Sequence, residues 1–220
     1  MKKVERYCMK IQRECKSCSG SGCRVCSGKQ NRAKKYAKAN IPVEYWSHSF
    51  KNFSGDSLFK SSMEPYIKDI EGMFDSGDSL MYVGSLGTGK SYMACCMLKM
   101  AITKDFSSQY TNMADIVNMI LSTSVDSFAY LRQLASYDFL VIDEFDSRWI
   151  FPSEKSEQIF GSSLEYVLRT RFQNHLPTIL CSNTEDTDKV LSGYFSKAFS
   201  SLRKKYVKVF YVSGKDYRGV

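Results

Sequence analysis

No stretch of this 220-residue sequence stays apolar over the roughly 20 residues that a helix needs to span a bilayer. The N-terminus also lacks the apolar core of a secretory signal, because the basic Met1–Lys3 leads into a mixed, polar stretch. The first absence argues against a membrane-spanning protein, and the second argues against export. We therefore expect a cytoplasmic protein with no membrane partner and with reduced thiols.

Acidic residues are scarce in the first part of the chain. Residues 1–38 carry 12 Lys/Arg but only 2 Glu, a net charge of +10. The remaining residues carry 19 Lys/Arg and 21 Asp/Glu, a net charge of −2. A basic segment of this kind contacts nucleic acid or an acidic protein face, or it serves only as a solubilising tail.

The same segment holds four cysteines, Cys15, Cys18, Cys23 and Cys26, in the spacing C-x2-C-x4-C-x2-C. Two such pairs supply four thiolates to one tetrahedral Zn²⁺, and a short segment with little core would fold around the metal. Disulfides, a redox pair or an iron–sulfur cluster are alternatives, and reduced thiols favour zinc. We expect residues 1–28 to form a four-cysteine zinc-binding module.

The rest of the chain alternates strand-like and helix-like segments. Residues 29–40 are basic and helix-prone and predict a linker helix, which Ile41-Pro42 ends. Residues 41–220 then predict an α/β domain whose central parallel sheet is flanked by helices. The expected strands are Leu80–Val83, a weak strand near Gln109–Tyr110, Phe139–Ile142, Pro177–Cys181 and Val207–Val212, and the expected helices include Ser91–Thr103 and Asn112–Leu121.

A glycine-rich phosphate-binding motif, G-x-x-x-x-G-K-[ST], lies between the first strand and the helix that follows it. Its glycines let backbone N–H groups cradle phosphate oxygens, its lysine reaches the β- and γ-phosphates, and its serine ligates Mg²⁺. An incidental glycine-rich turn is the alternative, and the strand–loop–helix context argues against it. The residues expected to bind ATP are Gly84, Ser85, Leu86, Gly87, Thr88, Gly89, Lys90 and Ser91.

Polar residues follow two further buried strands. Asp143 and Glu144 end the apolar run at Phe139–Ile142, where open α/β sheets bind their ligands. We expect Asp143, with Ser91, to hold Mg²⁺, and Glu144 to polarise the attacking water. Asn183 ends the next strand, and its amide could hydrogen-bond that water or the γ-phosphate, although an Asn here is often only a turn residue.

Together these stretches resemble the DnaC/DnaI-type helicase loaders of bacteria and phages, AAA+ ATPases of the family that also contains IstB-type transposition ATPases. Besides the P-loop, the run ending in Asp143-Glu144 looks like Walker B, and Leu176–Asn183 looks like sensor 1. The stretch Gly214–Arg218 looks like the sensor 2 region, with Arg218 as its arginine, and Ile41–Phe53 looks like the entry into the ATPase domain.

The resemblance implies a Mg-ATP switch that binds a hexameric, DnaB-type replicative helicase and delivers it to single-stranded DNA. It implies that the N-terminal module grips the helicase and that the ATPase domain self-associates around ATP. It also implies that there is no separate helical lid domain. The insertion between the second and third strands, about Asn112–Tyr137, is where such loaders contact DNA, and Arg132 is its only Lys or Arg.

One departure from the family pattern concerns the arginine that acts on a neighbouring subunit's ATP. The usual position reads Ser201 here, and Arg203 lies two residues further on. Arg169 and Arg171 are other candidates, unless they form a solvated helix face. Without such an arginine hydrolysis would be weak, since an arginine finger contributes about 10³-fold or more.

Two other functions remain open from the sequence. One is a transposition helper that acts on duplex DNA, and the other is an adaptor that binds ATP with little hydrolysis.

Overall fold

The computed structural model describes residues 2–122, 126–145, 154–183, 204–214 and 216. The chain divides into two compact units, Met1–Ser47 and His48–Val220. Arg203, Arg218 and Ser201, which the sequence singles out, lie outside the described residues.

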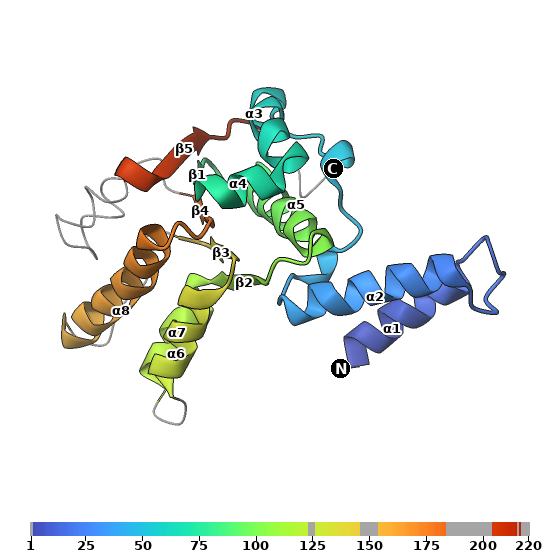
Figure 1. The fold of residues 1–220 in the computed structure, drawn as a ribbon, viewed down its shortest axis with the longest axis horizontal. Helices are drawn as coiled ribbons and strands as arrows, with labels where there is room; N and C mark the ends of the chain where they lie inside the picture. Colours follow the sequence, from blue (N-terminus) through green and yellow to red (C-terminus); the bar gives the residue numbers. More distant parts are fainter. Residues whose placement is uncertain (1, 123–125, 146–153, 184–203, 215, 217–220) are drawn as a thin grey trace. The chain divides into compact units, whose positions relative to one another are not determined.

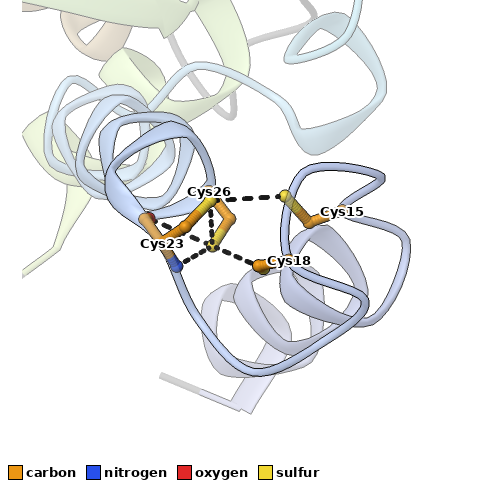
Figure 2. A group of neighbouring side chains, drawn as sticks. All are labelled: Cys15, Cys18, Cys23 and Cys26. Atoms are coloured by element: carbon orange, nitrogen blue, oxygen red, sulfur yellow. Dashed lines mark hydrogen bonds between the residues drawn. The ribbon is translucent and has the colours of Figure 1, made fainter.

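The N-terminal unit is a pair of helices, α1 (Lys2–Arg13) and α2 (Arg24–Lys38), followed by a short 3-10 turn, Val43–Tyr45. The two helices lie side by side (Figure 1), and the cysteine cluster sits where the chain turns between them (Figure 2). Gln12 Nε2 donates to Gly20 O at 3.0 Å, and Gln30 Nε2 donates to Cys8 O at 2.9 Å. One helix, α2, contains both Cys26 and most of the predicted linker 29–40, whose role as a linker stays a prediction.

The second unit is built on five strands, all paired in parallel, in the order β2-β3-β4-β1-β5. This arrangement confirms the predicted α/β class. The inner strands are buried along their whole length, which explains why they appear in the sequence as continuous apolar runs. Their bounds are β1 Ser79–Val83, β2 Ser108–Asn112, β3 Phe139–Asp143, β4 Thr178–Ser182 and β5 Val207–Tyr211.

Helices cover both faces of this sheet. Met81, Leu140 and Leu180 belong to a core with side chains of α6, α7 and α8. Alternate strand residues point the other way, so that Tyr82 meets Phe59 of α3, with ring centroids 4.9 Å apart. The bounds are α3 Ser57–Lys68, α4 Ile70–Ser76, α5 Lys90–Thr103, α6 Met113–Leu121, α7 Ser127–Ser136 and α8 Glu154–Gln173, with a 3-10 turn at Phe50–Asn52.

Helix α5 is buried nearly all round, as its sequence predicts for a core helix. Cys95 and Cys96 on this helix, and Cys181 on β4, are buried core residues. None of the described helices is both long and apolar enough to cross a membrane.

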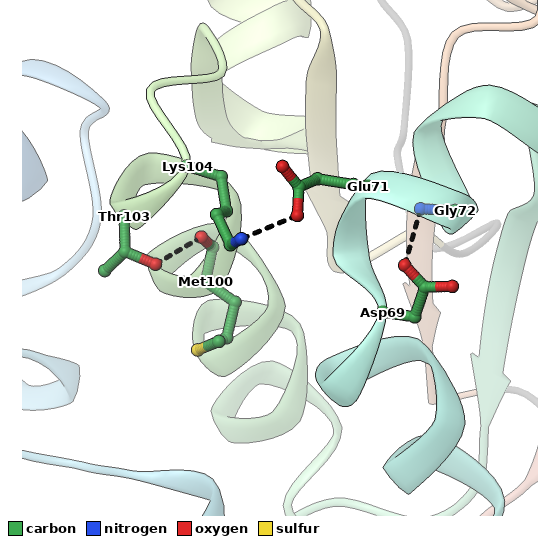
Figure 3. Close-up of polar contacts among 6 residues, drawn as sticks. All are labelled: Asp69, Glu71, Gly72, Met100, Thr103 and Lys104. Carbon is green, nitrogen blue, oxygen red and sulfur yellow. Dashed lines mark hydrogen bonds and ion pairs between the residues drawn. The ribbon is translucent and has the colours of Figure 1, made fainter.

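Polar contacts at the surface fix how α4 begins and where α5 ends (Figure 3). Asp69 caps α4 by accepting from Gly72 N at 2.8 Å, and a Cβ at Gly72 would lie 2.3 Å from the Asp69 carboxylate. Lys104, just after α5, pairs with Glu71 at 2.6 Å. Since exposed ion pairs contribute about 0–1 kcal/mol, this pair adds little to the stability of the unit.

The side chain of Arg171 in α8 is fully buried and joins three parts of the unit. Its guanidinium donates to Thr178 Oγ1 at 2.8 Å and to Pro177 O at 2.7 Å, at the start of β4. It also donates to Leu134 O at 3.0 Å and to Tyr137 O at 2.6 Å, at the end of α7. Burial lowers the pKa of Arg171 to about 9, which leaves the group charged at neutral pH.

Both sequence-based interpretations of Arg171 are therefore wrong. Its side chain lies on no solvated face, and a guanidinium enclosed by carbonyls within its own subunit does not reach a neighbouring ATP. Arg169 differs, because its side chain is one-third exposed and pairs with Glu165 on the same helix. Arg169 stays a candidate for the trans-acting arginine.

We expect Arg171→Met to destabilise the protein by about 3–5 kcal/mol, because several buried carbonyls would lose their donor. Arg171→Lys should recover only part of this, since one ammonium cannot meet all those acceptors. Urea unfolding measures the difference. The matched control is Arg169→Met, which removes a surface pair and should cost about 1 kcal/mol or less. Equal midpoints for the two methionine variants would contradict this role of Arg171.

Candidate functional site

The phosphate-binding motif forms the loop between β1 and α5. Gly84 starts the loop, and a Cβ there would lie 2.1 Å from Val212 O, so no side chain fits. Gly87 and Gly89 have φ angles of 75° and 95°, in the left-handed region that favours glycine. Gly89 is the N-cap of α5, so the positive end of the helix dipole points into the loop.

The side chain of Lys90 folds back into this loop and is buried. Its Nζ donates to Gly84 O at 2.8 Å and to Ser85 O at 2.7 Å, and it lies 3.4 Å from Thr88 Oγ1. Thr88 Oγ1 in turn donates to Ser85 O at 2.9 Å. Carbonyl oxygens of the loop thus surround the Lys90 ammonium. When a phosphate binds, its oxygens can replace these carbonyls as acceptors for the ammonium.

Asp143 ends β3, and two hydrogen bonds hold its carboxylate. Oδ2 accepts from the Tyr110 hydroxyl at 2.6 Å, and Oδ1 accepts from Glu144 N at 2.8 Å. Burial, followed by the nearby Asp143 charge, raises the pKa of Tyr110, so the phenol keeps its proton and remains a donor. A carboxylate held this way is oriented before any cation arrives.

Sequence reasoning missed Tyr110. Strand β2 pairs with β3 so that Tyr110 lies opposite Val141, two residues before Asp143. The two side chains are therefore near neighbours across the pair of strands. The contact could be predicted only from the pairing register of β2 with β3, which the sequence alone does not specify.

Glu144 projects from a sharp turn of the chain. Its φ is 53°, which is uncommon for a residue with a Cβ, and its side chain is exposed. The next residue, Phe145, is buried, and its N–H donates to Cys181 O at 2.7 Å. This bond to β4 fixes the turn and keeps the carboxylate of Glu144 outside the core.

The carboxyl ends of β1, β3 and β4 meet at one edge of the sheet, because β4 lies between the other two. Gly84 N donates to Ser182 O at 3.2 Å, which places the start of the phosphate loop beside the end of β4. Asn183, half-buried, is the next residue. The structure thus gathers the P-loop, Asp143-Glu144 and Asn183 at this edge, while the role of each side chain stays a prediction.

Two side chains border the phosphate loop. The ring of Phe53, from the stretch that resembles the family's domain entry, would lie 2.6 Å from a Cβ at Gly89. The carboxylate of Asp216, which sequence reasoning did not single out, would lie 1.8 Å from a Cβ at Gly87. A Cβ at Gly89 would press on the buried Phe53 ring, whereas the exposed Asp216 side chain could move away from one at Gly87, where the φ angle is the stronger reason for glycine.

The four cysteines of the N-terminal unit form a second candidate site (Figure 2). Their sulfurs all lie within 4.8 Å of one another. The Sγ–Sγ distances are 3.7 Å for Cys15–Cys23, 3.9 Å for Cys18–Cys26 and 3.8 Å for Cys23–Cys26. Tetrahedral zinc, with bonds of about 2.3 Å, needs edges of about 3.8 Å, whereas a disulfide needs about 2.0 Å. The cluster therefore fits a Zn²⁺ ion.

Backbone donors around the sulfurs also suit thiolates. Cys23 N donates to Cys26 Sγ at 3.0 Å, and Gly22 N donates to Cys18 Sγ at 3.3 Å. Although burial acts to raise the pKa of Cys18, the backbone donors, Gly22 first, lower it to about 7. Cys26 lies in the first turn of α2, where the helix dipole favours negative charge.

Comparison with solved structures supports the fold. The crystal structure of DnaI is 14% identical with a TM-score of 0.65, and the match covers 81% of this chain and 94% of that one. A structure of the DnaC helicase loader is 15% identical with a TM-score of 0.63, covering 78% and 100%. A primosome component from Streptococcus pyogenes serotype M3 is 17% identical with a TM-score of 0.64, covering 82% and 93%. At these identities the likeness shows the fold alone.

No curated protein matches the chain. The sequence model of the IstB-like ATP binding protein family matches residues 65–185, more than half of the chain and the part that carries the P-loop, Asp143-Glu144 and Asn183. The chain therefore belongs to the IstB-like ATP-binding family.

Proposed function

We propose that the protein is a Mg²⁺-dependent ATPase that loads a DnaB-type hexameric helicase onto single-stranded DNA during replication initiation. The observation that carries this proposal is the gathering of the P-loop, Asp143-Glu144 and Asn183 at one sheet edge, in a fold shared over most of its length with helicase loaders. The expected location is the bacterial cytoplasm.

The sheet edge carries groups suited to phosphate binding, Mg²⁺ binding and activation of water. Backbone N–H groups of the loop and the ammonium of Lys90 bind the phosphates, and the N-terminus of α5 adds its dipole. Ser91 and Asp143 would hold Mg²⁺, which neutralises phosphate charge when bound. Glu144 accepts a proton from the water that attacks the γ-phosphorus, and the bond to the β–γ bridging oxygen breaks to give ADP and phosphate. Asn183 orients that water.

Contacts from elsewhere would complete the site. Arg203 or Arg169 would act on the ATP of a neighbouring copy, and Arg218 would contact the γ-phosphate within its own chain. This scheme requires self-association around ATP. With Ser201 at the usual position of the trans-acting arginine, slow turnover is expected.

The N-terminal unit would hold the helicase, and Cys15, Cys18, Cys23 and Cys26 would hold Zn²⁺. The described core of this unit is small, with Cys26, Ala33, Ala39, Ile41 and Trp46 as its buried apolar residues. A unit with so little core draws much of its folding free energy from a bound metal.

The family match itself favours a second candidate, a transposition helper acting on duplex DNA, because the matched family is IstB-like. That protein would assemble along duplex DNA and would not bind the helicase. An adaptor that binds ATP with little hydrolysis is a third candidate, since Ser201 replaces the usual arginine.

We expect the purified protein to contain about one zinc ion per chain, measured by inductively coupled plasma mass spectrometry. Cys18→Ser combined with Cys26→Ser should lose it, and protease should then cut within residues 1–47 at least tenfold faster. Cys8→Ser is the matched control, because Cys8 is a half-buried cysteine outside the cluster. An unchanged digestion rate after complete zinc removal would contradict a structural metal.

The helicase proposal is tested by size exclusion with light scattering of the protein and its host's replicative helicase, with and without Mg-ATP. We expect a stoichiometric complex that is lost when residues 1–40 are deleted. No complex in any nucleotide state, together with Mg-ATP-dependent filaments on duplex DNA, would replace the loader with the transposition helper.

A further inference from the structure

A cavity of about 560 Å³ opens within the N-terminal unit, and all of its lining residues lie between Tyr7 and Ser47. This volume is within the range of sites that bind small molecules or anchoring side chains, about 300–1,000 Å³. None of the nucleotide-binding residues contributes to it.

One face of α2 supplies much of the wall. Val25, Lys29, Arg32 and Tyr36 line the cavity, and their spacing of three or four residues places them on one side of the helix. Cys15 and Lys16, from the first cysteine pair, line the cavity as well. The shape of this wall therefore depends on the cysteine cluster.

The charge of the lining is positive. Lys16, Lys29 and Arg32 are exposed, and within the described part of the chain none of them makes a hydrogen bond or an ion pair. The one lining acid, Glu14, follows the end of α1, and its Oε1 lies 3.9 Å from Nζ of Lys10, which partly balances its charge. Three cations around one cavity favour binding of an anionic ligand.

The lining also contains apolar side chains, and part of their aliphatic surface is exposed. Val25 is 51% exposed and Ile11 is half-buried. Trp46 is 6% exposed, its Nε1 donates to Ile41 O at 2.8 Å, and the Tyr7 ring meets it edge-on at 5.0 Å. Single-stranded nucleic acid stacks on open aromatic faces. The Trp46 ring is nearly covered and the lining tyrosines, Tyr7 and Tyr36, are half-buried, whereas Val25 is exposed. An aliphatic side chain of the partner therefore fits this surface better than a stacked base.

We propose that this cavity docks an acidic segment of a partner protein, with one aliphatic side chain against Val25 and Ile11 and flanking carboxylates at Lys16, Lys29 and Arg32. The identification of the helicase as that partner rests on the proposed function. The cavity's preference for acidic peptide is independent of it.

The peptide preference can be tested on the full chain with Trp46 as the reporter. The chain has two tryptophans, so Trp149→Phe leaves Trp46 alone. The probe is a synthetic peptide of one leucine between two runs of five glutamates. We expect a saturable change in Trp46 fluorescence and at least fivefold weaker binding when serine replaces the leucine. Displacement of this peptide by a 15-nucleotide oligo-dT, with tighter binding of the oligonucleotide, would overturn the proposal in favour of nucleic acid.

Charge reversal then locates the site. Lys29→Glu combined with Arg32→Glu should weaken both peptide and helicase binding at least tenfold. Lys34→Glu combined with Lys38→Glu makes the same charge change at exposed positions of α2 outside the cavity, and it should alter binding less than twofold. Equal effects of the two pairs would overturn the proposal.

The two proposals fail in different ways. If the wild-type protein binds the helicase and reversal at Lys29 and Arg32 has no effect, the cavity proposal is wrong and the loader remains. If the wild-type protein never binds the helicase, the loader proposal is wrong. The peptide titrations of the wild type and of the charge-reversed variants then decide alone whether the cavity binds an acidic peptide.

Discussion

The nucleotide site depends on the backbone hydrogen bonds of one strand, β4. Ser182 O accepts from Gly84 N at the start of the phosphate loop, and Cys181 O accepts from Phe145 N just beyond Glu144. Consecutive carbonyls of the same strand thus hold both halves of the site. Because β4 is buried along its length between β1 and β3, these bonds are shielded from water and the distance between the two loops is fixed.

The N-terminal unit follows a different physical principle. It has few buried apolar residues, a strong positive charge and four clustered thiols, so its stability would come largely from a metal. Within the described residues, Lys16, Lys29 and Arg32 form no ion pair, and they line a cavity. A unit built in this way is suited to recognising an acidic surface, whereas the second unit is suited to binding phosphates.

Features set by neighbouring residues in the chain could be predicted from the sequence. The apolar run at Phe139–Ile142 and the glycine motif at Gly84–Ser91 gave the strand, the loop and their order, because burial and turn geometry act over a few residues. The contacts of Tyr110 and Arg171 could not be predicted. Tyr110 meets Asp143 only through the pairing of β2 with β3, and Arg171 is buried only because the ends of α7 and β4 converge on it. Asp216 reaches Gly87 only when the end of the chain returns to the loop.

Hydrolysis of Mg-ATP at the sheet edge is tested most directly by comparing ATP binding with turnover in Glu144→Gln. We predict that phosphate release falls about 10²-fold or more, while a fluorescent ATP analogue binds with a Kd within threefold of the wild type. This outcome is expected because Glu144 is exposed at the edge and is not part of the phosphate loop. Unchanged phosphate release from a variant that still binds ATP would contradict the account.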